Sequence, residues 1–126
     1  MPVACLVAGA YVARLAVVFT LAWTHSVQKS EWQEDWRATP DGLVLDEVRV
    51  EGSGAGMEPP EGAVREGRFY VAHPGLPPQR EVLLRRSGAT ADWRVCTEGG
   101  CRPMGALLPS DLPPVDADPV RLTLCD

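Results

Sequence analysis

The stretch EWQEDWRATPDGLVLDEVRVE, residues 31–51, decides the fold of this chain because it fits two incompatible secondary structures. In the first, Ser30 and Gln33 form a capping box that opens a short helix. Trp32 and Trp36 would then lie at helical spacing on one face. This alternative makes the tryptophan-rich region helical.

The second structure is a β-hairpin with strands at 31–38 and 43–51. TPDG at 39–42 separates the two strands and is a turn signal, because proline presets its φ and glycine accepts a positive φ. Tryptophan also favours strands. We therefore predict the hairpin, and this choice favours a β fold for the whole chain.

The segment before the hairpin alternates with a period of two. Across 14–27, bulky side chains occupy the odd-numbered positions, and smaller or more polar ones occupy the even-numbered positions. The odd-numbered set is Leu15, Val17, Phe19, Leu21, Trp23, His25 and Val27. This alternation is typical of a half-buried strand. We predict one long strand over 14–27 and another at 3–8.

Residues 3–23 are long and apolar enough to cross a bilayer as a helix. Arg14 lies near the middle of this run, where a charge costs about 2.5 to 3.5 kcal/mol on an insertion scale. No Lys or Arg precedes the run, so the charged start of a signal peptide is missing. We predict no membrane span and a cytoplasmic location, with the periplasm as the alternative.

A two-residue turn at Lys29–Ser30, or a four-residue loop at 28–31 with the same register, would fold this long strand back onto the hairpin. In that register His25 lies across from Glu34, and Trp23 lies across from Trp36. Cross-strand neighbours on one face have Cβ atoms about 4.5 to 5.5 Å apart, so these side chains would touch.

The TPDG turn sets the register of the hairpin itself. It pairs Ala38 with Leu43 and Trp36 with Leu45, and farther along it pairs Glu34 with Glu47. The apolar phase slips before Val48, so a bulge near Asp46–Glu47 would turn that glutamate away. Without the bulge, one histidine and two glutamates stand side by side on three strands.

Further short strands are predicted after a Gly- and Pro-rich connection. They lie at 66–72, 80–86, 92–97, 101–107 and 119–125, and a Pro-rich linker at 109–119 precedes the last one. Frequent turns without a βαβ rhythm predict one antiparallel barrel or sandwich domain of about eight or nine strands over 1–126.

The composition excludes one class of partner. The 126 residues carry a formal net charge of −5, whereas nucleic-acid binding requires a basic surface. The sequence contains no cofactor motif, and we predict no cofactor.

The candidate binding residues are His25, Ser26, Glu34, Glu47, Trp23, Trp36, Gly54 and Gly56. Two interpretations of the histidine remain open: a buried ring satisfied by a neighbouring carboxylate, or part of a ligand site. Ser26 and His25 are no catalytic dyad, because adjacent strand residues point to opposite faces. We predict no catalytic residue. Three or four clustered zinc ligands are also missing, so we predict no metal ligand.

The glycines and cysteines are ambiguous by pattern alone. GSGAGM at 52–57 is either a turn or bulge, or a nest of backbone N–H groups that binds an anion. Cys96 and Cys101 would face each other across a hairpin, as a disulfide or as two thiols. In a reducing cytosol, thiols are the expected state for all four cysteines, at 5, 96, 101 and 125.

Several segments together resemble the small bacterial family labelled domain of unknown function 1850. They are FTLAWTHSV, EDW, LVLDEVRVEGSGAGMEPP, EGRFY and SGATADWRVC, and the resemblance extends over roughly residues 3–107. Its most specific parts are His25-Ser26-Val27, Glu34 and Gly54-Ala55-Gly56. Relatives usually show HSVE, whereas this chain has Gln28 at the last position.

The resemblance implies an accessory role rather than a reaction, since genes of the family often lie beside TRAP-type solute transporters of the TAXI kind. We therefore predict a non-catalytic domain that binds transporter subunits or a small solute. The alternative is a small metalloprotein or enzyme that uses His25, Glu34 and Glu47.

Overall fold

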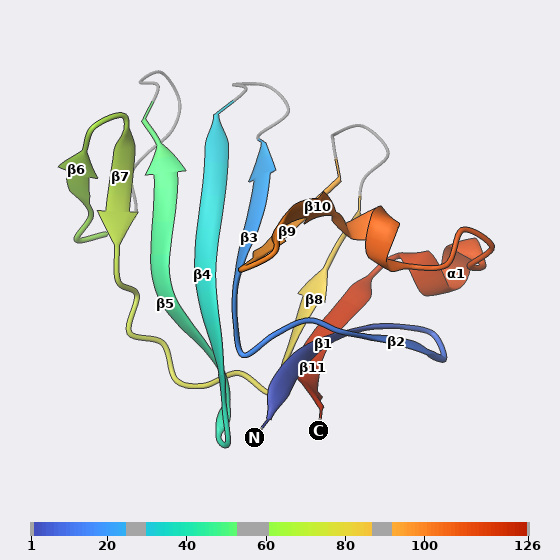
Figure 1. The fold of residues 1–126 in the computed structure, drawn as a ribbon. Helices are drawn as coiled ribbons and strands as arrows, with labels where there is room; N and C mark the ends of the chain where they lie inside the picture. Colours follow the sequence, from blue (N-terminus) through green and yellow to red (C-terminus); the bar gives the residue numbers. More distant parts are fainter. Residues whose placement is uncertain (1, 25–29, 53–60, 87–91, 126) are drawn as a thin grey trace.

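The predicted hairpin forms the centre of the larger of two antiparallel β-sheets. This computed structural model describes residues 2–24, 30–52, 61–86 and 92–125, which contain eleven strands. The large sheet has the order β10-β9-β3-β4-β5-β7-β6, and the small sheet has the order β2-β1-β11-β8 (Figure 1). The all-β prediction is confirmed, and the arrangement is the sandwich alternative rather than the barrel.

Each sheet is assembled from strands that are far apart in the chain. The large sheet contains β3 (Val18–Thr24), β4 (Glu31–Thr39), β5 (Gly42–Glu51), β6 (Val64–Glu66), β7 (Phe69–Ala72), β9 (Arg94–Thr97) and β10 (Gly100–Pro103). The small sheet contains β1 (Val3–Ala8), β2 (Tyr11–Arg14), β8 (Glu81–Leu84) and β11 (Val120–Cys125). A 3-10 helix η1 (Met104–Leu107) and a short helix α1 (Pro114–Ala117) follow β10.

Near the turn, β4 and β5 have the predicted register. Ala38 lies opposite Leu43, and Trp36 lies opposite Leu45. Gly42 has a φ of 139°, and a Cβ at this position would lie 2.7 Å from a neighbouring carbonyl oxygen. The glycine of TPDG is therefore required both by the backbone conformation and by the space around it.

The predicted strand over 14–27 is wrong in its first part. Its beginning belongs to β2 in the small sheet, and only β3 belongs to the large sheet. Between them the chain crosses from one sheet to the other: the N–H of Leu15 donates to the carbonyl of Ala4 (2.8 Å), and the carbonyl of Val17 accepts from Ala38 (2.7 Å). The side-chain alternation continues through this crossing, so periodicity alone does not reveal the break.

Three smaller predictions also differ from the structure. The strand predicted at 66–72 is the hairpin β6–β7, with Gly67 at a φ of 64° in its turn. The strand predicted at 101–107 ends at Pro103 and continues as η1. The linker at 109–119 contains α1. The strands predicted at 3–8, 80–86, 92–97 and 119–125 are present as β1, β8, β9 and β11.

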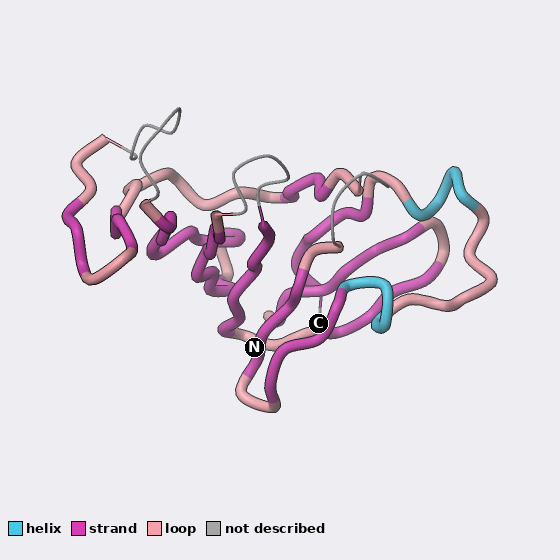
Figure 2. The backbone as a smooth tube through the Cα atoms, turned by 90° about the horizontal axis from the view of Figure 1, so that it is seen from above, coloured by secondary structure: helices cyan, strands magenta, loops and turns pink. Residues whose placement is uncertain are grey.

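The core forms where the small sheet covers part of the large one. Apolar side chains from both sheets and from η1 meet there, each at most 5% exposed: Phe19, Leu21, Trp36 and Leu43 from the large sheet, Leu6, Leu84, Val120 and Leu122 from the small sheet, and Met104. The β6–β7 edge of the large sheet lies away from the small sheet (Figures 1 and 2).

None of the helices among the described residues has the length and apolar character needed to span a membrane.

Two disulfides close the fold, in contrast to the predicted thiols. Cys96 and Cys101 are directly opposed on β9 and β10, with Cα atoms 3.9 Å apart. Cys5 and Cys125 join β1 to β11, with Cα atoms 6.0 Å apart. The second pair could not be anticipated, because only the pairing of the first and last strands brings its members together.

We expect loss of the Cys5–Cys125 disulfide to destabilise the fold more than loss of the Cys96–Cys101 disulfide. The cysteines are 120 residues apart in the first case and 5 in the second. Chain entropy then assigns about 5 kcal/mol to the long loop and about 2 kcal/mol to the short one. Urea unfolding of the two Cys→Ser double variants measures both losses. Equal losses, or a larger loss for the short loop, would contradict this expectation.

Candidate functional site

The inner face of the large sheet is the one whose side chains join the core shared with the small sheet, and the outer face is the opposite one. A row rich in aromatic residues crosses the inner face at the end where β3 stops and β4 begins. Trp23 lies opposite Trp32, which lies opposite Val50, and Val50 lies opposite Tyr70. The rings of Trp23 and Trp32 are stacked, with centroids 5.6 Å apart and planes at 22°. Trp93, just before β9, lies 6.1 Å from Trp23 with its ring tilted by 57°. Two strands and the segment that leads into β9 thus contribute to one tryptophan cluster.

The next row along the same face contains one charged residue among apolar ones. Leu21 and Val48 flank Glu34 directly, and the row continues to Val95 on one side and Ala72 on the other. These four apolar residues are at most 5% exposed. Glu34 itself is half-buried. A carboxylate in such a row loses much of its hydration and requires partners in the protein.

Two indole groups provide these partners. Trp32 Nε1 donates a hydrogen bond to Glu34 Oε2 (3.2 Å), and Trp36 Nε1 donates to Oε1 (3.1 Å). The three residues alternate along β4, so the pleat of the strand places their side chains on one face. The sequence W-x-E-x-W on a strand is therefore sufficient to build this arrangement locally.

The electrostatics of Glu34 follow from this environment. Burial raises its pKa above the ordinary value, and the two indole hydrogen bonds oppose the rise only in part. Among the described residues, no cationic side chain forms an ion pair with it. Such a group binds its proton more tightly than an exposed glutamate does, and its charged form can accept a positively charged ligand.

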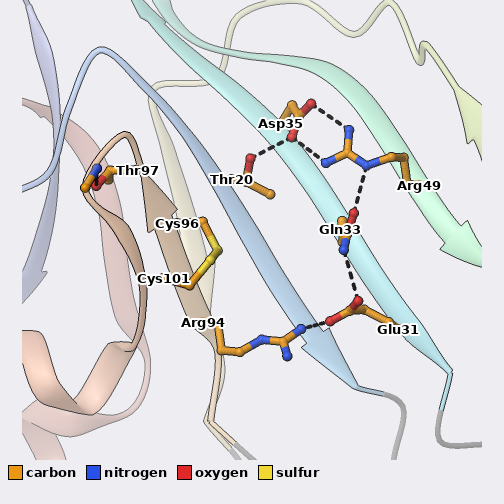
Figure 3. Close-up of a disulfide and its surroundings, with 10 residues drawn as sticks. Thr20, Glu31, Gln33, Asp35, Arg49, Arg94, Cys96, Thr97 and Cys101 are labelled. Carbon is orange, nitrogen blue, oxygen red and sulfur yellow. Dashed lines mark hydrogen bonds and ion pairs between the residues drawn. A yellow bond between two sulfur atoms is a disulfide. The ribbon is translucent and has the colours of Figure 1, made fainter.

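The neighbouring residue, Asp35, lies on the outer face and has the opposite environment (Figure 3). Arg49 binds both of its carboxylate oxygens, at 2.6 and 2.8 Å. Thr20 donates a further hydrogen bond at 2.7 Å. These donors, Arg49 foremost, lower the pKa of Asp35 below its ordinary value. Adjacent carboxyl groups of β4 thus have pKa values displaced in opposite directions.

The network continues along the outer face. Arg49 also donates to Gln33 (2.8 Å) and pairs with Glu47. Glu47 in turn contacts His73 Nε2 at 3.1 Å. Each side chain in this network is paired with an oppositely charged or polar neighbour. Such pairing is typical of a surface that stabilises the sheet rather than of a ligand-binding site.

The predicted pairing of β3 with β4 is wrong by four residues. Glu34 lies opposite Leu21 rather than His25, and Trp36 lies opposite Phe19 rather than Trp23. The last pair of the two strands is Thr24–Glu31. The connection between them is therefore longer than the turn assumed at Lys29–Ser30, a dipeptide with little turn preference. Because four is an even shift, every side chain keeps its predicted face.

The predicted proximity of Glu47 to Glu34 is also wrong. The register shifts between Asp35 and Trp36, which leaves Asp46 as an extra residue in β5. Glu34 therefore faces Val48, while Glu47 lies opposite Asp35 on the outer face. The anticipated bulge is present and removes this glutamate from the site.

Four of the sequence-predicted site residues lie outside the described residues: His25, Ser26, Gly54 and Gly56. The described part of the chain contains no group of three or more His, Cys, Asp or Glu side chains placed to hold a metal ion. The site that can be described consists of Trp23, Trp32, Trp36, Trp93 and Glu34, and we refer to it as the tryptophan–Glu34 cluster.

The predicted site residues lack two members of this cluster, Trp32 and Trp93, and no local pattern could have indicated Trp93. Its strand was predicted, but nothing in a short segment indicates which neighbour it pairs with. The observed pairing of Val95 with Leu21 places Trp93 beside Trp23. Arg49 and Asp35 were missed as partners as well, although their shared outer face follows from the same alternation that placed Glu34 on the inner one.

The family model described as Domain of unknown function (DUF1850) matches residues 19–104. The chain belongs to this family. The matched range of the DUF1850 family begins in β3 and ends at Met104, so it includes every residue of the tryptophan–Glu34 cluster. Strands β1, β2 and β11 of the small sheet lie outside it. Neither the curated proteins nor the solved structures contain a match to the chain.

The raised pKa of Glu34 should appear in the pH dependence of stability. The folded state binds this proton more tightly than the unfolded state, so the contribution is fully present below pH 4.5 and is lost as pH rises through the folded pKa. The glutamine of Glu34→Gln does not titrate, so the variant lacks this pH-dependent contribution. The unfolding free energy of the variant minus that of wild type should therefore increase as the pH is raised from 4.5 towards neutrality. Urea unfolding of both proteins at several pH values measures this difference in unfolding free energy.

The matched control is Glu81→Gln, because this carboxylate is 45% exposed on the small sheet and pairs with Arg121. We expect no such increase for the control. A difference between Glu34→Gln and wild type that stays constant across this pH range would contradict the raised pKa.

Asp35 should show the opposite pH dependence. Its pKa is lowered in the folded state, so its contribution is present above pH 3.8 and is lost as pH falls through the folded pKa. Asp35→Asn should cost about 1 kcal/mol at neutral pH, and the loss should shrink in acid. The control Asp46→Asn breaks a more exposed pair with Arg37 and should cost less. An equal loss at acid and neutral pH would refute this assignment.

Proposed function

We propose that this protein is a non-catalytic binding protein, accessory to a TRAP-type solute transporter, and that the tryptophan–Glu34 cluster is its binding surface. The observation that carries the proposal is a carboxylate in an otherwise apolar row, whose partners among the described residues are indole N–H groups beside tryptophan rings. Trp23, Trp32, Trp93 and Glu34 are all partly exposed. Ligand sites typically combine apolar and aromatic walls with a few placed polar groups.

The surroundings of Glu34 favour binding over catalysis. Acid–base chemistry with paired carboxylates would require a second titratable group beside it. Its described neighbours on the inner face are the apolar Leu21 and Val48 and the two indoles that it accepts from. The metalloprotein alternative also loses support, because Glu47 lies on the other face of the sheet.

The disulfides bear on the compartment. Disulfides persist in oxidising compartments such as the bacterial periplasm and are rare in the cytosol. All four cysteines of the chain are paired. The proposal therefore places this protein in the periplasm, where a solute-uptake system meets its substrate, in preference to the cytoplasmic location expected from the sequence.

Binding can be tested in two parallel measurements. Tryptophan fluorescence titrations of the purified protein use a panel of organic cations, organic anions and neutral solutes. Co-purification tests whether tagged protein retains the membrane subunits of a co-expressed TAXI-type transporter. We expect at least one measurement to show binding, and we expect both Glu34→Gln and Trp32→Phe to weaken it by at least about tenfold, which corresponds to about 1.4 kcal/mol.

Glu81→Gln again serves as the control and should bind as wild type does. Thermal unfolding of each variant establishes that it is folded before binding is compared. The absence of any binding in both measurements would refute the proposal. Binding that is insensitive to both cluster variants would refute the assignment of the surface.

A further inference from the structure

We propose that the ligand of the tryptophan–Glu34 cluster is an organic cation whose ammonium group lies against Glu34 and the tryptophan rings. This inference rests on the proposed binding function and names the chemical class that the site selects.

The first argument is the missing counter-charge. Several other carboxylates near or on the large sheet are paired with an arginine: Asp35 with Arg49, Glu31 with Arg94, Asp46 with Arg37, and Asp92 with Arg86. Glu34 is more deeply set in apolar surroundings than a surface carboxylate, yet its described partners are neutral indoles. A cationic ligand would supply the charge that arginine supplies elsewhere.

The second argument is the unused hydrogen-bonding capacity of the carboxylate. Its two oxygens offer about four acceptor sites. Trp32 and Trp36 occupy one site on each oxygen. Leu21 and Val48, its cross-strand neighbours, have no side-chain donor. The remaining acceptor sites therefore suit a donor or a positive charge that comes from outside the sheet.

The third argument is the arrangement of the rings. The faces of aromatic rings attract cations, and tryptophan does so most strongly. Trp93 is tilted by 57° against Trp23, whereas Trp23 and Trp32 are nearly parallel. Trp23, Trp32 and Trp93 form one partly exposed group of rings next to Glu34, and aromatic rings are the groups that hold quaternary ammonium ions in aromatic cages. An anion would meet both the carboxylate and the electron-rich faces, and both would repel it.

The net charge of the protein also favours a cationic ligand. The chain carries a formal charge of −5, so its long-range field favours the approach of cations over anions. The short-range chemistry of the cluster and the overall charge therefore select the same class of ligand.

The test compares three probes: choline, the smaller primary amine ethanolamine, and the neutral 3,3-dimethylbutan-1-ol, which has the shape of choline without its charge. Tryptophan fluorescence and isothermal titration calorimetry measure the affinities for wild type. We expect at least one cation to bind at least tenfold more tightly than the neutral probe. Tighter binding of choline identifies a quaternary ammonium ligand, and tighter binding of ethanolamine identifies a primary amine that donates to Glu34.

Variants then assign the binding to the cluster. Glu34→Gln should weaken the preferred cation at least tenfold and leave the neutral probe nearly unchanged, while Glu81→Gln should change neither. The inference is overturned if the neutral probe binds as tightly as both cations, if neither cation binds, or if Glu34→Gln retains the cation affinity. If the variant fails to fold, the comparison of the three probes on wild type still tests whether the protein prefers a cation to the neutral probe.

Failure of this inference is distinguishable from failure of the proposed function. If the cations fail but an anionic solute, a neutral solute or the transporter subunits bind in a manner that depends on Trp32, the binding function stands and only the ligand class is wrong. If nothing binds, both are wrong.

Discussion

The position of β4 between β3 and β5 is the constraint on which the chemistry of this protein depends. The strand places Glu34 on the inner face and Asp35 on the outer face, as the pleat requires. One carboxyl group is then surrounded by indoles and aliphatic side chains, and the other by an arginine and a threonine. Two acidic residues adjacent in sequence thereby acquire pKa values displaced in opposite directions.

The bulge at Asp46 completes this separation. Without the extra residue, β5 would present Glu47 to Glu34, and the two carboxylates would repel each other in an apolar row. With it, Val48 occupies that position, and Glu47 joins the outer network with Arg49 and His73. The inner face keeps one carboxylate among tryptophans, a combination that weakens folding and is typical of a functional residue.

The small sheet covers part of the large sheet, and the tryptophan–Glu34 cluster lies on the large one. The small sheet, within which the Cys5–Cys125 disulfide joins β1 to β11, contributes Leu6, Leu84, Val120 and Leu122 to the core that it shares with the large sheet. The family match begins in β3 and includes the large sheet and β8. The tryptophan–Glu34 cluster therefore lies in the part of the chain that defines the DUF1850 family, at the end of the sheet where β3 stops and β4 begins.

The sequence by itself determined the local features: the strands around TPDG, the pairing of Ala38 with Leu43, the presence of a bulge near Asp46, and the face on which each β4 side chain lies. These depend on turn chemistry and on a period of two, which short segments contain. Tertiary structure alone decided the crossing between sheets at residues 15–17, the partner of Trp93 and the Cys5–Cys125 disulfide. It also decided that Leu21 rather than His25 faces Glu34. Strand partners and loop lengths are set by packing between distant segments, and no local pattern encodes that packing.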